Sequence, residues 1–342
     1  MTGLRVLWLS PWMRPLARVY AEALRDAGAE VLLVTSDQHP ASDAARPYEL
    51  VLRPRPKQLR TWPEAARAAQ RCNDFAPDVV VSELVRDPRW LAFARGAPRV
   101  ELIHDDRPHD AGEIRPRWER ALFDRPARRS RWVAFSRYVA DEVCAADVVP
   151  LTSDLADSEV PAFVPAAGRR DFVLVGRLNG YKNIDLCLQA WQKHTAGRSW
   201  AGDDLVLLGD GEWTGALPEH VVWQREPFRY ADVLPQLARA KGSIVHYRRA
   251  SQSGVQVLAM QLGVASVVST EGALPEFQPP GESPIDVDDV DGLARAFDAL
   301  ADPGRAAARG SAAQEHYRRT YSASVSAQAL LGVLSRAAVR QG

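Results

Sequence analysis

The chain has 342 residues, of which 46% are hydrophobic and 25% charged, and its 43 basic and 43 acidic side chains leave no formal net charge. This length is typical of two globular domains, and a neutral chain lacks the positive surface on which a dedicated nucleic-acid binder depends. The sequence contains neither a stretch long and apolar enough to span a bilayer nor a signal peptide, so we expect a cytoplasmic protein.

The predicted strands of the first half are short apolar runs that alternate with amphipathic stretches. Gly28 marks the end of the first intervening helix, since glycine commonly follows a helix C-terminus. Strands that alternate with helices imply right-handed crossovers and a parallel sheet. The predicted strands of this half are residues 5–10, 30–36, 78–84, 99–104 and 131–136.

The cysteines of the chain are few and far apart: Cys72, Cys144 and Cys187. Their spacing fits neither a zinc site nor a secreted disulfide framework. We expect each to be a small buried side chain, and we expect no metal and no cofactor.

Residues 151–170 are rich in Pro, Ala, Ser and Asp and predict a linker, after which the alternation of strands and helices restarts. The chain is predicted to be helical after Pro303. The fold class is therefore α/β, with two doubly wound, Rossmann-like domains and a C-terminal helix packing across both. The predicted strands of the second half are residues 171–177, 204–210, 242–247 and 265–270, and the predicted boundaries are 1–160 for the first domain, 168–318 for the second and 319–342 for a helix returning to the first.

Two basic side chains follow the first strand of the second domain. Arg177 ends that strand, and Lys182 precedes a helix that begins near Ile184. Ligands of open parallel sheets bind at the carboxyl ends of the strands, and two cations beside the N–H groups of a helix start suit a diphosphate. The spacing is equally compatible with two solvated charges on a loop.

A glycine-rich stretch, GDGEWTG at residues 209–215, does not match the dinucleotide-binding fingerprint. Its glycines have a different spacing, and the residues that follow lead into another strand instead of a helix. We interpret it as a tight turn.

Small polar residues precede an apolar helix in the second domain: Ser251, Gln252, Ser253 and Gly254. Hydroxyl and N–H groups at a helix N-terminus form an uncharged anion site. The alternative is simple N-capping by Ser251 or Ser253.

Gly272 lies in the turn that follows the next strand. Because the carboxyl ends of parallel strands share one edge, this turn and residues 251–254 open on the same side as Arg177 and Lys182. This convergence predicts a site for a phosphate or sugar ligand more strongly than any one motif does.

Polar residues also follow a strand of the first domain: His104, Asp105 and Asp106. A histidine here can donate to a sugar hydroxyl or stabilise developing charge, and a carboxylate can orient an acceptor. His109, on the same loop, is a further candidate. The alternative is a satisfied buried histidine beside two solvated carboxylates.

The second half resembles the family-4 retaining glycosyltransferases, which have the GT-B fold of two facing Rossmann-like domains. The resemblance covers roughly residues 171–303 and rests, in order, on FVLVGRLNGYKN, DLVLLGDGE, YADVLPQLARAKGSIVHYRRASQSG, VLAMQLGVASVVSTEGALPE and PIDVDDVDGLARAFDALADP. It implies that Arg177 and Lys182 bind the donor diphosphate and that the loop at 251–254 supplies backbone donors to it.

The family's usual pair of glutamates, eight positions apart, is absent. Ala250 and Leu258 stand in their places. In the family the first glutamate holds the donor sugar and the second holds the nucleotide ribose. Gln252 and Ser253 are candidates to replace them.

The first domain resembles the family in its opening strand and helix. The Gly-rich turn often found after that strand is replaced by residues 11–15, PWMRP. Arg14 in this turn is a candidate to approach the diphosphate from the opposite wall, with a solvated arginine as the alternative. The family often has a His or His-Asp at the place of His104 and Asp105, facing the acceptor and donor sugar.

Residues 115–132 are dense in arginine and contain Trp118 and Trp132. Such a segment fits contact with anionic lipid, as in related enzymes with lipid-linked acceptors. Because Glu119 and Asp124 are interspersed, a solvated helix with ion pairs is the favoured interpretation.

We therefore expect a hexosyltransferase that moves a sugar from a nucleotide diphosphate donor to an acceptor hydroxyl, and the resemblance implies that it retains the anomeric configuration and needs no metal. A UDP-sugar is favoured and a GDP-sugar is the alternative, with His104, Asp105, Arg177 and Lys182 as the catalytic candidates. The acceptor is a small molecule, a glycan or a lipid-linked molecule, the last of these with peripheral contact at the inner membrane surface. Two alternatives stay open: a catalytically silent nucleotide- or sugar-binding module or partner subunit, and a nucleotide-sugar epimerase on the same fold.

Overall fold

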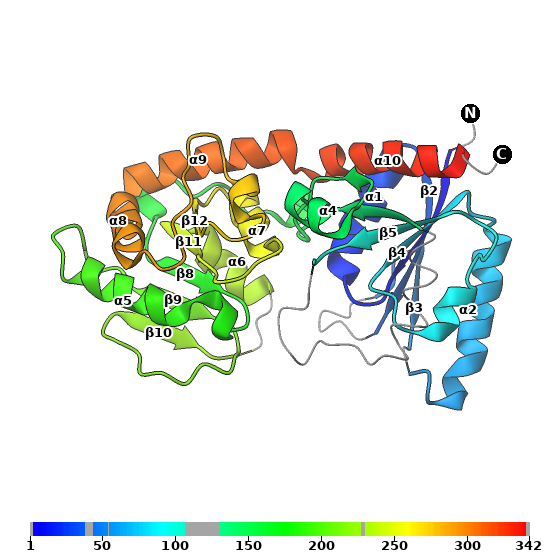
Figure 1. The fold of residues 1–342 in the computed structure, drawn as a ribbon, viewed down its shortest axis with the longest axis horizontal. Helices are drawn as coiled ribbons and strands as arrows, with labels where there is room; N and C mark the ends of the chain where they lie inside the picture. The colour runs from blue at the N-terminus through cyan, green and yellow to red at the C-terminus, as the bar shows by residue number, and fades with distance from the viewer. Residues whose placement is uncertain (1–2, 38–43, 54, 107–129, 227–229, 340–342) are drawn as a thin grey trace. The chain divides into compact units, whose positions relative to one another are not determined.

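The computed structural model divides into two compact units (Figure 1). Unit 1 contains residues 1–155 together with 323–342, and unit 2 contains residues 156–322. The C-terminal helix thus belongs to the unit that contains the N-terminus. The structure describes residues 3–37, 44–53, 55–106, 130–226 and 230–339.

Unit 1 is built on a parallel sheet with the strand order β3-β2-β1-β4-β5-β6-β7. Its buried strands coincide with the predicted apolar runs, whereas two strands, β3 and β7, were not predicted because they have only four and two residues. The strands are β1 (Arg5–Ser10), β2 (Glu30–Ser36), β3 (Glu49–Leu52), β4 (Val79–Glu83), β5 (Arg99–Ile103), β6 (Arg131–Ala134) and β7 (Asp147–Val148).

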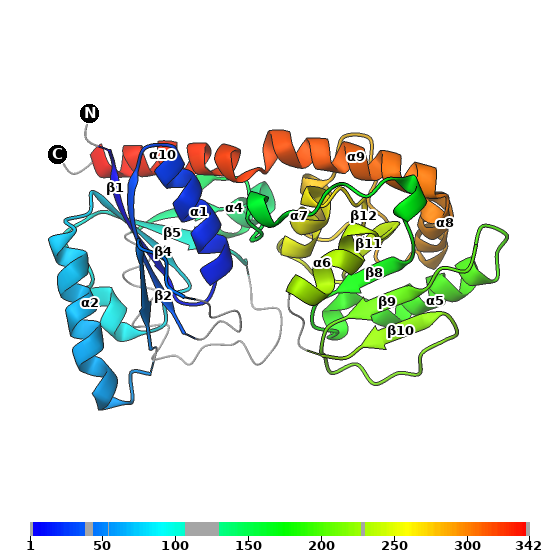
Figure 2. The same ribbon diagram turned by 180° about the vertical axis from the view of Figure 1, so that it is seen from behind.

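Helices cover both faces of this sheet, with α1 and α2 on opposite sides (Figure 2). Leu7, Leu9 and Val80 of the sheet pack against Ala68 and Cys72 of α2. On the other side α10 lies along α1. The helices of unit 1 are α1 (Arg14–Asp26), α2 (Trp62–Asp74), α4 (Arg137–Val143) and α10 (Ala323–Val339).

Local signals account for most helix ends. Gly28, in the left-handed conformation with φ 93°, follows α1 as predicted. The end of α4 is different, because Cys144 occupies the left-handed position at φ 56° and is exposed. The prediction that every cysteine is buried is therefore wrong for Cys144, whereas Cys72 and Cys187 are buried and burial raises the pKa of both thiols to about 12.

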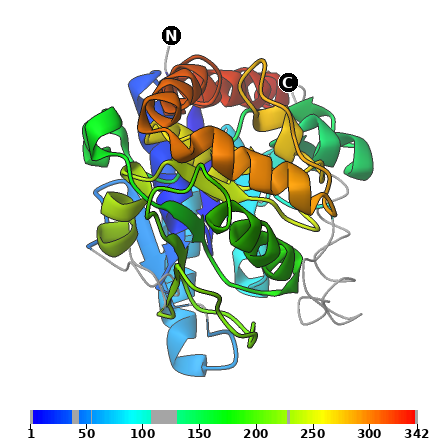
Figure 3. The same ribbon diagram turned by 90° about the vertical axis from the view of Figure 1, so that its left-hand side faces the viewer.

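Unit 2 has a second parallel sheet with the strand order β10-β9-β8-β11-β12. On one face α5 and α8 lie side by side (Figure 3), and α7 packs with α9. The strands are β8 (Phe172–Val175), β9 (Leu205–Leu208), β10 (Val221–Gln224), β11 (Gly242–Val245) and β12 (Ser266–Val268); the helices are α5 (Ile184–Thr195), α6 (Tyr230–Ala238), α7 (Gly254–Gln261), α8 (Val290–Ala301) and α9 (Pro303–Thr320).

An aromatic cluster forms part of the core of unit 2. The ring of Phe172 in β8 meets Trp191 of α5 and Phe297 of α8 edge to face, at centroid distances of 5.6 and 5.1 Å. Edge-to-face pairs at this separation are favourable beyond the area that they bury. They fix β8, and with it the loop that follows this strand.

Both sheets have a topological switch point, where consecutive crossovers leave in opposite directions. It lies between β1 and β4 in unit 1 and between β8 and β11 in unit 2. In open parallel sheets a ligand binds outside the carboxyl ends of the strands at such a point. The residues that follow these four strands are therefore where each unit is built to hold a ligand. Within the described part of the chain, no helix is long and apolar enough to cross a membrane.

Candidate functional site

Three loops meet at the carboxyl edge of the second sheet. They follow β8, β11 and β12, and backbone hydrogen bonds join them. The N–H of Arg248 donates to the carbonyl of Tyr181 at 2.7 Å, and the N–H of Ala273 donates to the carbonyl of Ser251 at 3.3 Å. The structure thus brings the loops of Lys182, Ser251 and Gly272 together.

Lys182 is buried at this edge, with a relative exposure of 3%. Its Nζ donates to the carbonyl of Val175 at 2.9 Å and to the hydroxyl of Tyr247 at 2.8 Å. Burial lowers the pKa of Lys182 to about 8, and the nearby charge of Arg177, which is exposed, acts in the same direction. No described carboxylate forms an ion pair with this lysine.

The backbone beside Lys182 requires a glycine. Gly176 has φ 113°, and a Cβ at this position would lie 2.9 Å from the lysine Nζ. A larger residue would therefore meet both backbone strain and a clash with the ammonium group. The turn that ends β8 is shaped around the lysine.

Tyr247 is the residue of this edge that the sequence analysis missed. It lies two positions after β11 and belongs to a buried cluster with Val245, Val268 and Leu274. Burial raises the pKa of its hydroxyl, and a hydrogen bond from Ser253 partly offsets this rise. Tyr247 thus links Lys182 to the N-terminus of α7.

The N-terminus of α7 forms the uncharged part of the site. Ser253 caps the helix, its hydroxyl accepting from the N–H of Gln256 at 3.4 Å. The N–H groups of Gly254 and Val255 have no acceptor among the described residues, as expected for the first turn of a helix. Gly254 is exposed and nothing lies within 4 Å of the position that a Cβ would take, so a ligand has room to approach.

The remaining predicted residues of this edge lie around that helix start. Ser251 is buried and Gln252 is half-buried, and Oε1 of Gln252 has no partner in the described part of the chain. Gly272 adopts the left-handed conformation, with φ 53°, in the turn after β12. These residues therefore lie on the loops that meet at this edge of the sheet.

The positions of the family's glutamates are apolar and buried. Ala250 has an exposure of 5% and Leu258 one of 3%. Neither position supplies a carboxylate, so a donor sugar or ribose bound here must be held by other groups.

The carboxyl edge of the first sheet contains a buried histidine–carboxylate pair. His104 follows β5, and its Nε2 lies 2.6 Å from Oε1 of Glu83, the last residue of β4. The indole N–H of Trp8 donates to the other Glu83 oxygen at 3.3 Å, and the ring of Phe135 lies 4.9 Å from the imidazole. Glu83 was not predicted, although a glutamate that ends a buried strand is a signal that could have identified it.

Glu83 also decides the protonation of His104. Burial by itself would lower the pKa of the imidazole, but the hydrogen bond and charge of Glu83, with the charge of Asp105, raise it above the ordinary value of 6.5. Asp105 is exposed and Asp106 is half-buried beside it. His109, and residues 115–129 with Trp118, Glu119 and Asp124, lie outside the described residues.

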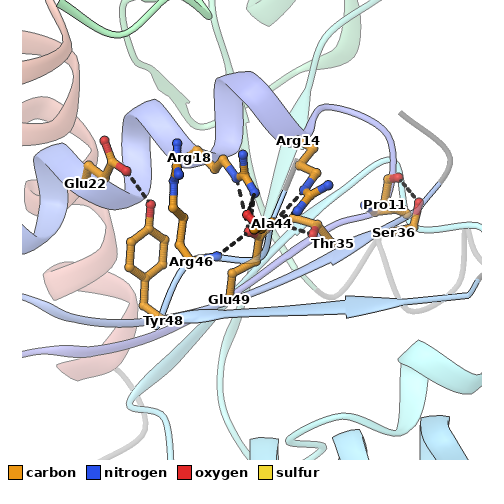
Figure 4. Close-up of polar contacts among 10 residues, drawn as sticks. All are labelled: Pro11, Arg14, Arg18, Glu22, Thr35, Ser36, Ala44, Arg46, Tyr48 and Glu49. Atoms are coloured by element: carbon orange, nitrogen blue, oxygen red, sulfur yellow. Dashed lines mark hydrogen bonds and ion pairs between the residues drawn. The ribbon is translucent and has the colours of Figure 1, made fainter. Parts of the chain in front are cut away.

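Arg14, the first residue of α1, is buried in an ion-pair cluster centred on Glu49 of β3 (Figure 4). Its Nε donates to Glu49 at 2.7 Å, and Arg18 donates to the same carboxylate at 2.6 Å. Thr35 and the N–H of Arg46 complete the set at 2.6 and 3.1 Å. The charge of Arg14 is therefore compensated within unit 1.

Glu49 is held ionised by these contacts. Burial would raise the pKa of its carboxyl group, but the hydrogen bonds from Arg14, Arg18, Thr35 and Arg46 lower it to about 2. The cluster fixes the start of α1 against β2 and β3. No group of three or more His, Cys, Asp or Glu side chains that could hold a metal ion occurs within the described ranges.

Two family models match the chain, one over each half. Residues 16–152 match the model described as Glycosyltransferase Family 4. Residues 169–302 match the model described as Glycosyl transferases group 1. No curated protein matches the sequence of the chain.

Solved structures with similar folds match the chain over nearly its whole length. Sucrose-phosphate synthase from Thermosynechococcus elongatus is 16% identical, with a TM-score of 0.70 over 99% of this chain and 100% of that one. An alpha-glucosyltransferase in complex with UDP and a mismatched DNA is 12% identical, with a TM-score of 0.68 over 98% and 100%. An alpha,alpha-trehalose-phosphate synthase (UDP-forming) from Burkholderia xenovorans, in complex with glucose-6-phosphate, is 11% identical, with a TM-score of 0.66 over 97% and 100%. At these identities the likeness concerns the fold, which is GT-B.

Proposed function

We propose that this chain, which belongs to the family-4 glycosyltransferases, transfers a hexose from a nucleotide diphosphate sugar to an acceptor hydroxyl with retention of configuration. One observation carries the proposal. At the switch point of unit 2, a buried lysine that pairs with no carboxylate among the described residues lies in the loop that meets the loop leading into α7. A cation and a helix N-terminus at one edge suit the diphosphate of a donor.

In this proposal the donor diphosphate binds to unit 2. Arg177 and Lys182 neutralise its charge, and the N–H groups of Gly254 and Val255 donate to its oxygens. When the glycosidic bond breaks, negative charge grows on the leaving diphosphate, and preorganised donors stabilise that charge most. A bound diphosphate also favours the protonated form of Lys182, because an opposite charge nearby raises the pKa of an amine.

Uridine is the favoured base of the donor. Two of the structures with a similar fold are described with UDP or as UDP-forming, which supports UDP without excluding GDP. Retention of configuration and independence of a metal follow from the resemblance of residues 171–303 to the family. Ser251, Gln252, Ser253 and Gly272 are the groups that we assign to the donor sugar and ribose in place of the missing glutamates.

The acceptor binds to unit 1 in this proposal. Glu83 engages Nε2 of His104 and favours the charged imidazolium, which leaves Nδ1 as the nitrogen that can donate to a substrate. A fixed donor of this kind can orient a sugar hydroxyl or stabilise developing charge. The exposed Asp105 and the half-buried Asp106 can accept hydrogen bonds from the acceptor hydroxyls.

A second candidate function rests on the two missing carboxylates. Because Ala250 and Leu258 are buried and apolar, the chain could bind a nucleotide sugar without transferring it. This would make it a catalytically silent module or the partner of an active subunit.

A thermal-shift screen against UDP, GDP, ADP, CMP and dTDP tests the donor site first. A ligand that binds only the folded state stabilises it, by about 2.7 kcal/mol when its concentration is a hundred times Kd. We expect one nucleotide to raise the unfolding temperature, and Arg177→Ala and Lys182→Ala to abolish the rise. Lys193→Ala, which removes an exposed lysine of α5, is the matched control and should keep it.

The same screen separates the two candidate functions when release of the sugar is followed as well. Nucleotide binding together with transfer or slow hydrolysis of the corresponding nucleotide sugar supports the enzyme. Binding without either, across a broad panel of acceptors, supports the silent module. Absence of binding for all five nucleotides would contradict the proposed donor site.

A further inference from the structure

Trp12 is an exposed aromatic side chain at the switch point of unit 1. It follows β1 by two positions, at the edge where His104 follows β5, and 43% of its surface is exposed. Two other tryptophans of this unit, Trp8 and Trp90, are fully buried. Trp12 therefore does not belong to the hydrophobic core of unit 1.

The indole N–H of Trp12 is also unused. Six other described tryptophans donate their N–H to an oxygen of the chain: Trp8, Trp62, Trp191, Trp200, Trp213 and Trp223. For Trp12 the described residues provide no such acceptor. Its ring thus presents an apolar face together with a free donor.

The turn that carries Trp12 is fixed on both sides. The carbonyl of Pro11 accepts from the hydroxyl of Ser36 at 2.5 Å (Figure 4), and the carbonyl of Met13 accepts from the N–H of Ala17 at 2.8 Å. Arg14, two residues on, is anchored to Glu49. A ligand that stacks on the ring therefore binds a largely ordered turn, which reduces the entropy lost on binding.

The charge of the turn indicates a neutral ligand. Arg14 is the nearest cation in the sequence, and its charge is compensated by Glu49, so the turn offers little attraction to a phosphate. A planar apolar face with one N–H donor instead matches a sugar ring, which has an apolar C–H face and a rim of hydroxyl groups.

We propose that Trp12 is the stacking platform of the acceptor site and that the acceptor presents a pyranose ring to it. This inference rests on the proposed function, and it narrows the acceptor class from any hydroxyl compound to a glycoside. It also assigns a role to the turn in which the chain departs from the Gly-rich turn of its family.

Fluorine NMR of the full chain labelled with 5-fluorotryptophan tests the contact directly. The Trp12 resonance is assigned as the one lost in Trp12→Phe, and the protein is titrated with the methyl pyranosides of glucose, galactose and mannose, with glycerol as the control. We expect the Trp12 resonance to move saturably with at least one pyranoside, while the Trp62 resonance, from a side chain that is 49% exposed, stays in place. No movement with any pyranoside, or equal movement with glycerol, overturns the inference.

Kinetics with a glycoside acceptor provide the second measurement. We expect Trp12→Ala to raise the acceptor KM roughly tenfold while kcat stays within about threefold, because the ring binds substrate and transition state alike. Trp12→Phe should restore most of the affinity, and Trp62→Ala should have no effect. An unchanged KM in Trp12→Ala contradicts the inference.

UDP binding in the same samples separates this inference from the proposed function. Trp12→Ala should keep the nucleotide-dependent thermal shift, because Trp12 lies in unit 1 and the proposed nucleotide site lies in unit 2. If wild-type protein binds no nucleotide, the proposed function fails. If it binds a nucleotide and no glycoside affects Trp12, only the present inference fails.

Discussion

The carboxyl edges of the two sheets differ in how their charges are balanced. In unit 1 the charged groups are paired with carboxylates of the chain itself, Arg14 with Glu49 and His104 with Glu83. In unit 2 the buried cation Lys182 contacts neutral oxygens, those of Val175 and Tyr247. The two sheets share the order of five strands, but they differ in how the charges at their carboxyl edges are compensated.

This difference indicates which substrate each edge suits. A buried charge is costly unless it is compensated, and unit 1 compensates its charges before any ligand arrives. Lys182 is compensated only in part, which its lowered pKa reflects. A diphosphate would complete that compensation, whereas the edge of unit 1 gains more from a neutral, hydroxyl-rich ligand.

The largest effect is expected from breaking the pairing in unit 1 with Glu49→Gln. The substitution leaves Arg14 and Arg18 without their carboxylate, and removal of one partner of a buried ion pair typically costs about 3–5 kcal/mol. Hydrogen exchange of unit 1 amides measures the loss, because a single unfolding curve would mix the two units. Glu30→Gln, which changes an exposed glutamate of β2, is the control and should change little.

The pH dependence of the stability of unit 1 tests the same ion pairs of Glu49. The folded pKa of Glu49 is about 2, below the ordinary 4.5, so its contribution to stability is present above pH 4.5 and is lost as the pH falls through 2. The shift corresponds to about 3 kcal/mol. Glu49→Gln should lack this part of the acid dependence, and an unchanged acid profile would contradict the role of the cluster.

The second prediction concerns the cation of unit 2. We expect Lys182→Met to weaken UDP binding about 30- to 150-fold, since hydrogen bonds from a charged group contribute roughly 2–3 kcal/mol. Lys182→Arg should retain part of the affinity. Isothermal titration calorimetry measures both, and equal affinity in Lys182→Met would remove this lysine from the donor site.

The lowered pKa of Lys182 also predicts how the binding of a nucleotide diphosphate changes with pH. Its pKa in the free protein is about 8, below the ordinary 10.5, and a bound diphosphate raises it. Above pH 8 binding must therefore take up a proton, and Kd should rise by up to about tenfold per pH unit. The folding stability of the free protein changes with pH in the opposite direction. Between about pH 8 and 10.5 this lysine is protonated in the unfolded chain and not in the folded protein. Its contribution to stability therefore rises with pH over this range.

The sequence predicted those parts of the molecule that depend on local patterns. Apolar runs located β1 and β2 to the residue, and the resemblance to the glycosyltransferase family and the GT-B fold class are confirmed. The loops of Lys182 and Gly272 could be placed on one edge because parallel strands end on the same side. None of these inferences needed the order of the strands.

The contacts that depend on strand order could not be predicted. Glu83 reaches His104 because β4 lies beside β5, and Glu49 reaches Arg14 from β3, a strand of four residues that was too short to be recognised. The sequence analysis consequently named Arg14 as a candidate for the diphosphate, with a solvated side chain as the alternative, and missed its buried partner Glu49. Tyr247 escaped notice for the same reason, because its role is defined by a lysine 65 positions away.

The third prediction concerns the pairing of Glu83 with His104 in unit 1, which Glu83→Gln tests. The pKa of His104 is raised because Glu83 overcomes the effect of burial, so its stabilising contribution is present below pH 6.5 and is lost as the pH rises through the folded pKa. Without the carboxylate, burial dominates and the pKa of His104 should fall below the ordinary 6.5. NMR titration of the imidazole measures it, and a pKa that stays raised would show that Asp105 is the governing charge.

The smallest effect is expected from Tyr247→Phe, which tests how Lys182 is held. The variant keeps the ring, whose centroid lies 4.2 Å from Nζ, and removes the hydroxyl that accepts from it. Loss of one such hydrogen bond costs about 1 kcal/mol and leaves the ammonium group less well compensated, so the pKa of Lys182 should fall further below 8. UDP affinity should then decrease about fivefold at pH 8 and hardly at all at pH 6, where the lysine is protonated in both proteins. Tyr48→Phe is the matched control, because it removes a hydroxyl that donates to Glu22 in unit 1, away from Lys182. An equal loss at both pH values would mean that Tyr247 contacts the nucleotide itself instead of setting the charge of the lysine.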